Sequence, residues 1–132
     1  MIKYRKRKQW KYTLEEDIVF NTEILPMEKY DIGVLKINYN GRLVISKGYV
    51  WDGASFIAKD TKTFMRASCV HDAIYQLIRE GVLPQSARKR ADEIMRDIMI
   101  EDGASKFRAW YAYKFVRAMG KGSAQSRILT AP

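Results

Sequence analysis

The fold of this chain is indicated most clearly by one stretch, Leu35-Lys36-Ile37-Asn38-Tyr39-Asn40-Gly41-Arg42-Leu43-Val44-Ile45-Ser46. Leu35, Ile37 and Tyr39 alternate with polar residues, so on a strand they share one face. The dipeptide Asn40-Gly41 accepts positive φ at both central positions of a tight turn. We therefore predict an antiparallel hairpin that turns at Asn40-Gly41 and buries the face carrying Leu35, Ile37 and Tyr39.

The residues upstream of this hairpin also have the composition of strands. Trp10–Leu14 and Asp17–Glu23 carry β-branched and aromatic residues at roughly alternate positions. From about Thr63 onward the apolar spacing changes to that of helices. We predict three helices, which are expected near residues 63–80, 87–102 and 105–119. Ser86 and Ser105 are placed to cap the second and third of them.

The third predicted helix is rich in aromatic residues. Its large apolar side chains are Phe107, Trp110, Tyr111, Tyr113, Phe115 and Met119. Because they are spread around the helix, we expect this helix to be buried on most sides rather than to form a cofactor-binding surface. The last segment, residues 121–132, is small and polar, and it is expected to drape over the surface or to fray.

Together these elements predict an α+β fold in which an N-terminal antiparallel sheet packs on three C-terminal helices. A chain of 132 residues fits one domain, with strands mainly in 1–50, helices in 60–120 and a tail after residue 120. Hydrophobic content of 47% excludes a disordered chain. No apolar run reaches the roughly 18 residues of a membrane span, and the basic N-terminus lacks the apolar stretch of a secretory signal.

Cys69 is the single cysteine, which excludes an internal disulfide framework. It lies in a helical apolar pattern, where a buried and inert thiol is the usual case. Synthesis in a reducing cytosol is the natural expectation.

The chain is strongly basic, with a net charge of +9 from 24 Lys and Arg against 15 Asp and Glu. Positive residues are concentrated near the N-terminus, at Lys3, Arg5, Lys6, Arg7, Lys8 and Lys11. Such clustering attracts polyanions, whether nucleic acid, an anionic lipid surface or an acidic protein patch. The alternative is a solvated segment that only keeps the protein soluble.

His71 is the only histidine and the first candidate for chemistry. Tyr75 lies one helical turn further on the same face, whereas Asp72 points about a hundred degrees away. Asp92 lies on the inward edge of the second helix, and a helical hairpin would bring it opposite His71. Asp92 would then fix the tautomer of His71, Tyr75 would hold Asp92, and the other ring nitrogen would take a proton from water.

A cation site is also predicted next to this group. Asp72 could bind a cation, and the loop that contains Asp52 and Gly53 could add backbone oxygens of the kind calcium prefers. The alternative is that His71 and Asp92 form a purely structural pair, which is a common arrangement for a partly buried histidine.

Three ordered motifs resemble those of a family of short bacteriophage and prophage proteins. They are Trp51-Asp52-Gly53-Ala54-Ser55, His71-Asp72-Ala73-Ile74-Tyr75 and Ala91-Asp92. In that family an Asp-Gly-Ala-Ser loop follows an N-terminal sheet and precedes a His-Asp-x-x-Tyr helix. The likeness covers roughly residues 30 to 120 and implies an origin more than an activity. With a phage origin, the expected location is the bacterial host cytoplasm or the phage virion.

The two helical motifs are also similar to the catalytic helices of the phospholipase A-two superfamily, over about 45 residues. The nearest likeness is the disulfide-free form found in parvovirus capsid proteins. The resemblance implies that His71 activates water, that Asp72 binds calcium, and that Asp92 and Tyr75 orient His71. This chain departs from the superfamily because only Gly48 and Gly53 stand where a glycine-rich calcium loop is expected, and because the N-terminal sheet has no counterpart.

Three functions are compatible with these features. The first is a phage-encoded His–Asp hydrolase, calcium-dependent and phospholipase-like, at anionic membranes. The second is a non-enzymatic virion component of the tail or neck, or an accessory protein, whose partners are phage structural proteins. The third is a nucleic-acid binder that uses the basic N-terminus with Tyr4, Trp10 and Tyr12 as stacking surfaces.

Overall fold

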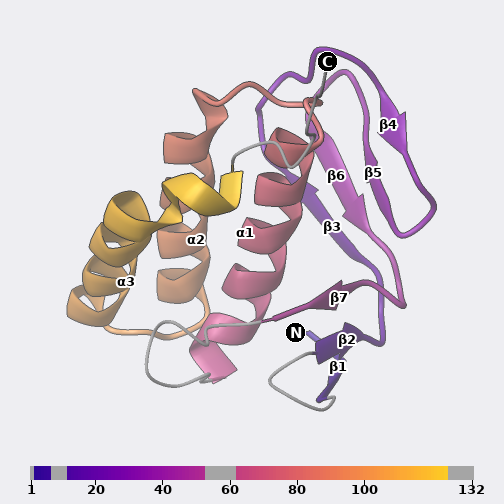
Figure 1. The fold of residues 1–132 in the computed structure, drawn as a ribbon. Helices are drawn as coiled ribbons and strands as arrows, with labels where there is room; N and C mark the ends of the chain where they lie inside the picture. The colour runs from indigo at the N-terminus through magenta and orange to yellow at the C-terminus, as the bar shows by residue number, and fades with distance from the viewer. Residues whose placement is uncertain (1, 7–11, 53–61, 125–132) are drawn as a thin grey trace.

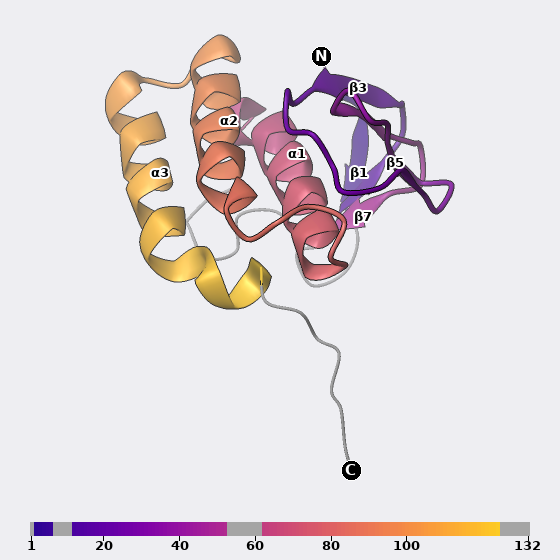
Figure 2. The same ribbon diagram turned by 90° about the horizontal axis from the view of Figure 1, so that it is seen from above.

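The computed structural model describes residues 2–6, 12–52 and 62–124. Antiparallel strands in two sheets come first and three helices follow, so the predicted α+β class is confirmed (Figure 1). Seen from above, α3, α2 and α1 stand in a row and the strands lie beyond α1 (Figure 2). α1 is therefore covered on both sides, by α2 and by the strands.

The strands form two sheets rather than the single predicted one. The smaller sheet has the order β1-β2-β7, and the larger has the order β3-β6-β5-β4. Their bounds are Tyr4–Lys6 (β1), Tyr12–Leu14 (β2), Ile18–Asn21 (β3), Tyr30–Asp31 (β4), Leu35–Ile37 (β5), Arg42–Ile45 (β6) and Val50–Trp51 (β7). The split follows from Gly48, whose φ of +99° turns the chain after β6. β7 thereby leaves β6 and pairs with β2 instead.

The hairpin lies where it was predicted, but its turn is one residue longer. Ile37 pairs with Leu43, and the Gly41 amide donates to the Asn38 carbonyl at 3.0 Å. Gly41 has a positive φ of +82°, whereas Asn40 does not. This is the three-residue turn that ends in a left-handed glycine. As a consequence Tyr39 lies at the exposed tip of the turn, and the prediction that it shares the buried face was wrong.

The three helices lie within a residue of their predicted bounds: α1 is Lys62–Arg79, α2 is Ala87–Glu101 and α3 is Lys106–Met119. The Ser105 hydroxyl caps α3 by accepting from the Arg108 amide at 3.1 Å. Ser86 makes no such side-chain bond, because its own backbone is already helical. Ser86 therefore occupies the predicted N-cap position of α2 without capping it through its side chain. The turn that begins α2 is closed instead by a bond from the Ala87 amide to the Pro84 carbonyl.

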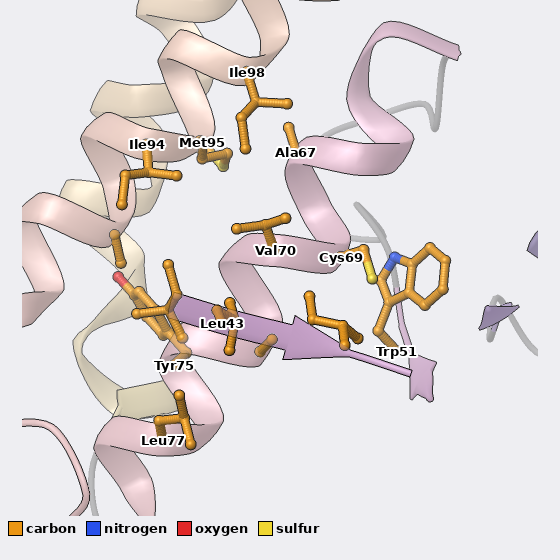
Figure 3. Close-up of a cluster of buried hydrophobic side chains, with 14 of the residues drawn as sticks. Leu43, Trp51, Ala67, Cys69, Val70, Tyr75, Leu77, Ile94, Met95 and Ile98 are labelled. Carbon is orange, nitrogen blue, oxygen red and sulfur yellow. The ribbon is translucent and has the colours of Figure 1, made fainter. Parts of the chain in front are cut away.

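The core is built around α1. Figure 3 shows Trp51 beside the fully buried Cys69 on one side of α1, and Ile94 with Ile98 of α2 on the other. The Trp51 indole donates to the Ser68 hydroxyl at 2.9 Å, which ties the small sheet to the helix. Cys69 was predicted to be buried, and it is.

The prediction that α3 is buried on most sides was wrong. α3 contributes only Ala109, Ala112 and Val116 to the interior, and it packs on one side, against α2. Its side chains Phe107, Trp110, Tyr111 and Met119 are exposed. Small residues let the helix approach α2 closely, and the bulky residues are left on the outside.

The start of the predicted tail is also structured. Residues Gly120–Ala124 form a 3-10 helix, η2. Ala124 is fully buried, and its carbonyl accepts a bond from the Gln85 side chain at 2.8 Å. The rest of the predicted tail, residues 125–132, lies outside the described residues. No helix among residues 62–124 is long and apolar enough to cross a membrane.

Candidate functional site

His71 of α1 and Asp92 of α2 meet between the two helices. The His71 Nε2 atom lies 2.7 Å from Oδ1 of Asp92. Gly81, with a positive φ of +78°, ends α1 and lets the chain reverse, so that α2 runs back alongside α1. This reversal carries residue 92 back across from residue 71, as the spacing of 21 residues predicted.

Asp92 is the centre of a buried network. Its Oδ1 accepts from the Tyr75 hydroxyl at 2.7 Å as well as from His71, and its Oδ2 accepts from Nη1 of Arg117 at 2.9 Å. The side chain of Asp92 is fully buried. An ionised carboxylate only accepts hydrogen bonds, so Nε2 of His71 carries a hydrogen. The other nitrogen, Nδ1, is the one left to act as a base.

Arg117 of α3 is a member of the site that the sequence analysis missed. It supplies the positive charge that a buried carboxylate requires. Arg88 of α2 helps to fix the position of Arg117, because its Nη2 donates to the Arg117 carbonyl at 2.8 Å. The need for a cation near Asp92 could have been foreseen. Which of several arginines provides it depends on where α3 docks, and no local pattern encodes that.

Nδ1 of His71 faces Asp72. The distance from Nδ1 to Oδ1 of Asp72 is 3.9 Å, which is too long for a hydrogen bond, so the two groups interact through charge. Burial lowers the pKa of His71, but Asp72 and Asp92 outweigh burial, and the net effect is a raised pKa. His71 itself is only 4% exposed. The side chain of Asp72 is 30% exposed, so Asp72 is the member of the pair that solvent contacts.

The hydroxyl of Tyr75 stays protonated and can therefore donate a hydrogen bond. Burial, followed by its bond to Asp92, raises the pKa of its hydroxyl well above the usual value. Its ring lies 4.2 Å from the ring of His71, measured between centroids. Gly120 makes room for it, since a Cβ at that position would lie 2.7 Å from the Tyr75 hydroxyl. In Figure 3 this hydroxyl points away from α1 toward α2.

The predicted cation ligands are only partly described. Burial raises the pKa of Asp72, and the charge of Asp52 raises it further, so these two carboxylates lie within electrostatic reach of each other. Gly53 lies outside the described residues. Within 2–6, 12–52 and 62–124, no group of three or more His, Cys, Asp or Glu side chains is placed to hold a metal.

The predicted polyanion-binding residues are described only in part. Lys3 forms a solvent-exposed ion pair with Glu16 at 2.7 Å. Arg5 and Lys6 belong to β1, which pairs with β2. The others of that set, Arg7, Lys8 and Lys11, lie outside the described residues.

Comparison with known proteins returns one family. No curated protein and no solved structure matches the chain. A family described as "Protein of unknown function (DUF1353)" matches residues 34–116. This segment runs from the start of β5 through most of α3 and includes His71, Tyr75 and Asp92, while Arg117 follows directly after it. Since the match covers well over half of the sequence, the chain belongs to the DUF1353 family.

Proposed function

We propose that this protein is a hydrolase in which His71 activates water, and that it is calcium-dependent and phospholipase-like, acting on esters of anionic phospholipids. One observation carries the proposal. Nε2 of His71 is bonded to the buried carboxylate of Asp92, while Nδ1 faces the partly exposed Asp72. A histidine held in this way has a fixed tautomer and one nitrogen free of the carboxylate, on the side of the partly exposed Asp72.

The residues divide the work as follows. Nδ1 of His71 accepts a proton from water, and the water oxygen forms a bond to the ester carbonyl carbon. The bond from that carbon to the leaving alcohol oxygen then breaks, and Nδ1 returns the proton to this oxygen. Asp92 stabilises the imidazolium that exists between these events. Tyr75 and Arg117 hold Asp92 through one carboxylate oxygen each.

Asp72 and Asp52 are the described residues that would hold calcium. Burial and, to a lesser extent, the charge of Asp52 raise the pKa of Asp72, and a divalent cation would relieve both effects. When bound, calcium would polarise the ester carbonyl. The sequence resemblance to the phospholipase A-two superfamily supports the same assignment, and the phage-type motifs support a phage origin.

The second candidate is a virion or accessory protein in which the same contacts only join the helices. It is favoured by the deep burial of His71 and Asp92. A network that links α1, α2 and α3 would stabilise the fold whether or not it performs chemistry. The two candidates differ in their activity. Only the hydrolase should release fatty acid, and it should lose this activity when His71 is replaced by a residue without a titratable base.

The test is fatty-acid release from phosphatidylglycerol vesicles, with calcium present or chelated. The wild-type protein should release fatty acid only with calcium. His71→Gln keeps a polar side chain but lacks the titratable base, so the rate should fall by about 10²–10⁴-fold. Asp92→Asn should reduce the rate less, because it disturbs orientation and leaves the base in place. Thermal melting of both variants checks that they remain folded.

Asp97→Asn is the matched control, since Asp97 lies on the same helix and pairs with Arg96 at the surface. It should keep the wild-type rate. Equal rates for wild type and a folded His71→Gln variant would assign the hydrolysis to other residues. A wild-type protein that releases no fatty acid and binds no calcium would favour the virion candidate.

A further inference from the structure

The outer face of α3 is unusual because its largest apolar side chains are turned away from the protein. Phe107 is 73% exposed and Trp110 is 51% exposed, and Tyr111 is similarly open. On a helix, residues 107, 110, 111 and 114 fall on one side, opposite Ala109, Ala112 and Val116 that contact the protein. A cluster of exposed aromatic side chains on one helix marks a surface that binds something.

The charge of this region is one-sided. From Gly103 to the end of the chain there is no Asp or Glu, whereas Lys106, Arg108 and Lys114 lie on α3 among the aromatic residues. All three of these basic residues are exposed. The occupant of the surface must therefore combine an apolar interior with negative charge at its boundary.

We propose that the outer face of α3 docks on an anionic phospholipid bilayer, with Phe107, Trp110 and Tyr111 entering the interface. Aromatic residues on one side of a helix with Lys and Arg beside them are the composition of helices that lie in the membrane surface. The long basic side chains reach anionic headgroups while their stems stay along the apolar region. The choice of phospholipid rests on the proposed function, since that function acts on the same class of lipid.

Two other occupants fit less well. In a symmetric dimer the same patch faces itself, which would set the basic residues of α3 against one another without an acidic partner. Single-stranded nucleic acid stacks on open ring faces along a groove. Here the rings of Phe107 and Trp110 pack on each other instead, with centroids 6.1 Å apart, and they project from one convex helix.

Docking through α3 would also place the candidate site close to the lipid. Arg117 lies on the same helix and bonds to Asp92. A helix with its side chains is about 10 Å across, and α2 stands between α3 and α1 (Figure 2), so the network of His71 and Asp92 would lie roughly one to two helix diameters from the membrane surface. α3 would then serve both the site, through Arg117, and the membrane, through its outer face.

The test is co-sedimentation of the full chain with vesicles of non-hydrolysable ether lipids, in the presence of a chelator. Vesicles containing phosphatidylglycerol should bind the protein, and pure phosphatidylcholine vesicles should bind it less. The double variant Phe107→Ser/Trp110→Ser should lower partitioning by at least about tenfold, because two buried aromatic anchors are lost. Its melting temperature should stay close to wild type, since both side chains are exposed in the free protein.

The matched control is Leu25→Ser/Met27→Ser, which removes two equally exposed apolar side chains, 68% and 63% open, from the loop between β3 and β4. This variant should bind as wild type does. The Trp110→Phe variant should bind vesicles but lose the blue shift of tryptophan fluorescence that wild type shows on binding, which would assign the shift to Trp110.

Full binding by Phe107→Ser/Trp110→Ser would overturn the inference, and so would an equal loss in the Leu25/Met27 variant. Binding to a single-stranded oligonucleotide but to no vesicle would also overturn it. The outcome is separable from the proposed function. α3-dependent binding without any hydrolysis would keep the inference and remove the enzyme. If the Phe107→Ser/Trp110→Ser variant binds vesicles and hydrolyses lipid as wild type does, the proposed function is kept and the inference about α3 is removed.

Discussion

α1 and α3 are both rich in apolar and aromatic residues, yet the protein uses them in opposite ways. α1 buries residues on both of its sides, from Phe64 to Ile78, between α2 and the strands. α3 buries Ala109, Ala112 and Val116 and exposes Phe107, Trp110 and Tyr111. The comparison shows that apolar content does not determine burial. What decides it is the number of neighbouring elements that cover the helix.

The largest effect should come from the carboxylate that joins the two helices. Asp92→Ala removes the partner of His71, Tyr75 and Arg117 together. Removing one member of a buried ion pair costs about 3–5 kcal/mol, and we expect a loss of that size in the free energy of unfolding, measured by urea denaturation. Asp92→Asn keeps an acceptor and should lose roughly 1–3 kcal/mol.

A loss below about 1 kcal/mol for Asp92→Ala would mean that α3 is held by its small residues alone. α1 would then be a core helix, and α3 a helix that is only loosely attached to the protein. Asp97→Ala, at an exposed carboxylate of α2, should change the stability by less than about 0.5 kcal/mol.

A smaller effect is expected where the chain leaves α3. Gly120→Ala would place a Cβ 2.7 Å from the Tyr75 hydroxyl of α1. Either the hydroxyl moves and loses Asp92, or η2 shifts, and overpacking of this kind costs about 1–3 kcal/mol. Gly122→Ala is the matched control, because a Cβ there meets nothing within 4 Å. Equal melting temperatures for the two variants would show that α3 and η2 can move away from α1 freely.

The smallest effect on stability should come from removing Trp110, the largest side chain of α3. Trp110→Ala should change the free energy of unfolding by less than about 0.5 kcal/mol, since Trp110 is half exposed and lies on the uncovered face. Ile74→Ala removes fewer atoms from α1 but should cost about 2–5 kcal/mol, because Ile74 is fully buried. Urea denaturation of the two variants measures both values. A loss above 2 kcal/mol for Trp110→Ala would contradict the exposed position of α3.

Sequence reasoning succeeded for features that depend on neighbours along the chain. The hairpin near Gly41 and the bounds of the three helices follow from turn chemistry and apolar period. The contact of His71 with Asp92 was also within reach, because a short reversal at Gly81 leaves two helices few ways to pair. The turn length was less accessible, since Asn40-Gly41 suits both the two-residue and the three-residue hairpin.

By itself the sequence determined the α+β order of elements, the helical hairpin and the group formed by His71, Tyr75 and Asp92. Only the tertiary structure decided that Arg117 neutralises Asp92, that β7 joins a second sheet, and that the largest exposed rings of α3 face outward. The physical reason is that period and turn chemistry act within a few residues. Which side of a helix is covered depends on how elements distant in the chain pack against one another. The face of α3 with the small residues Ala109 and Ala112 packs on α2, because it allows the two helices to approach most closely.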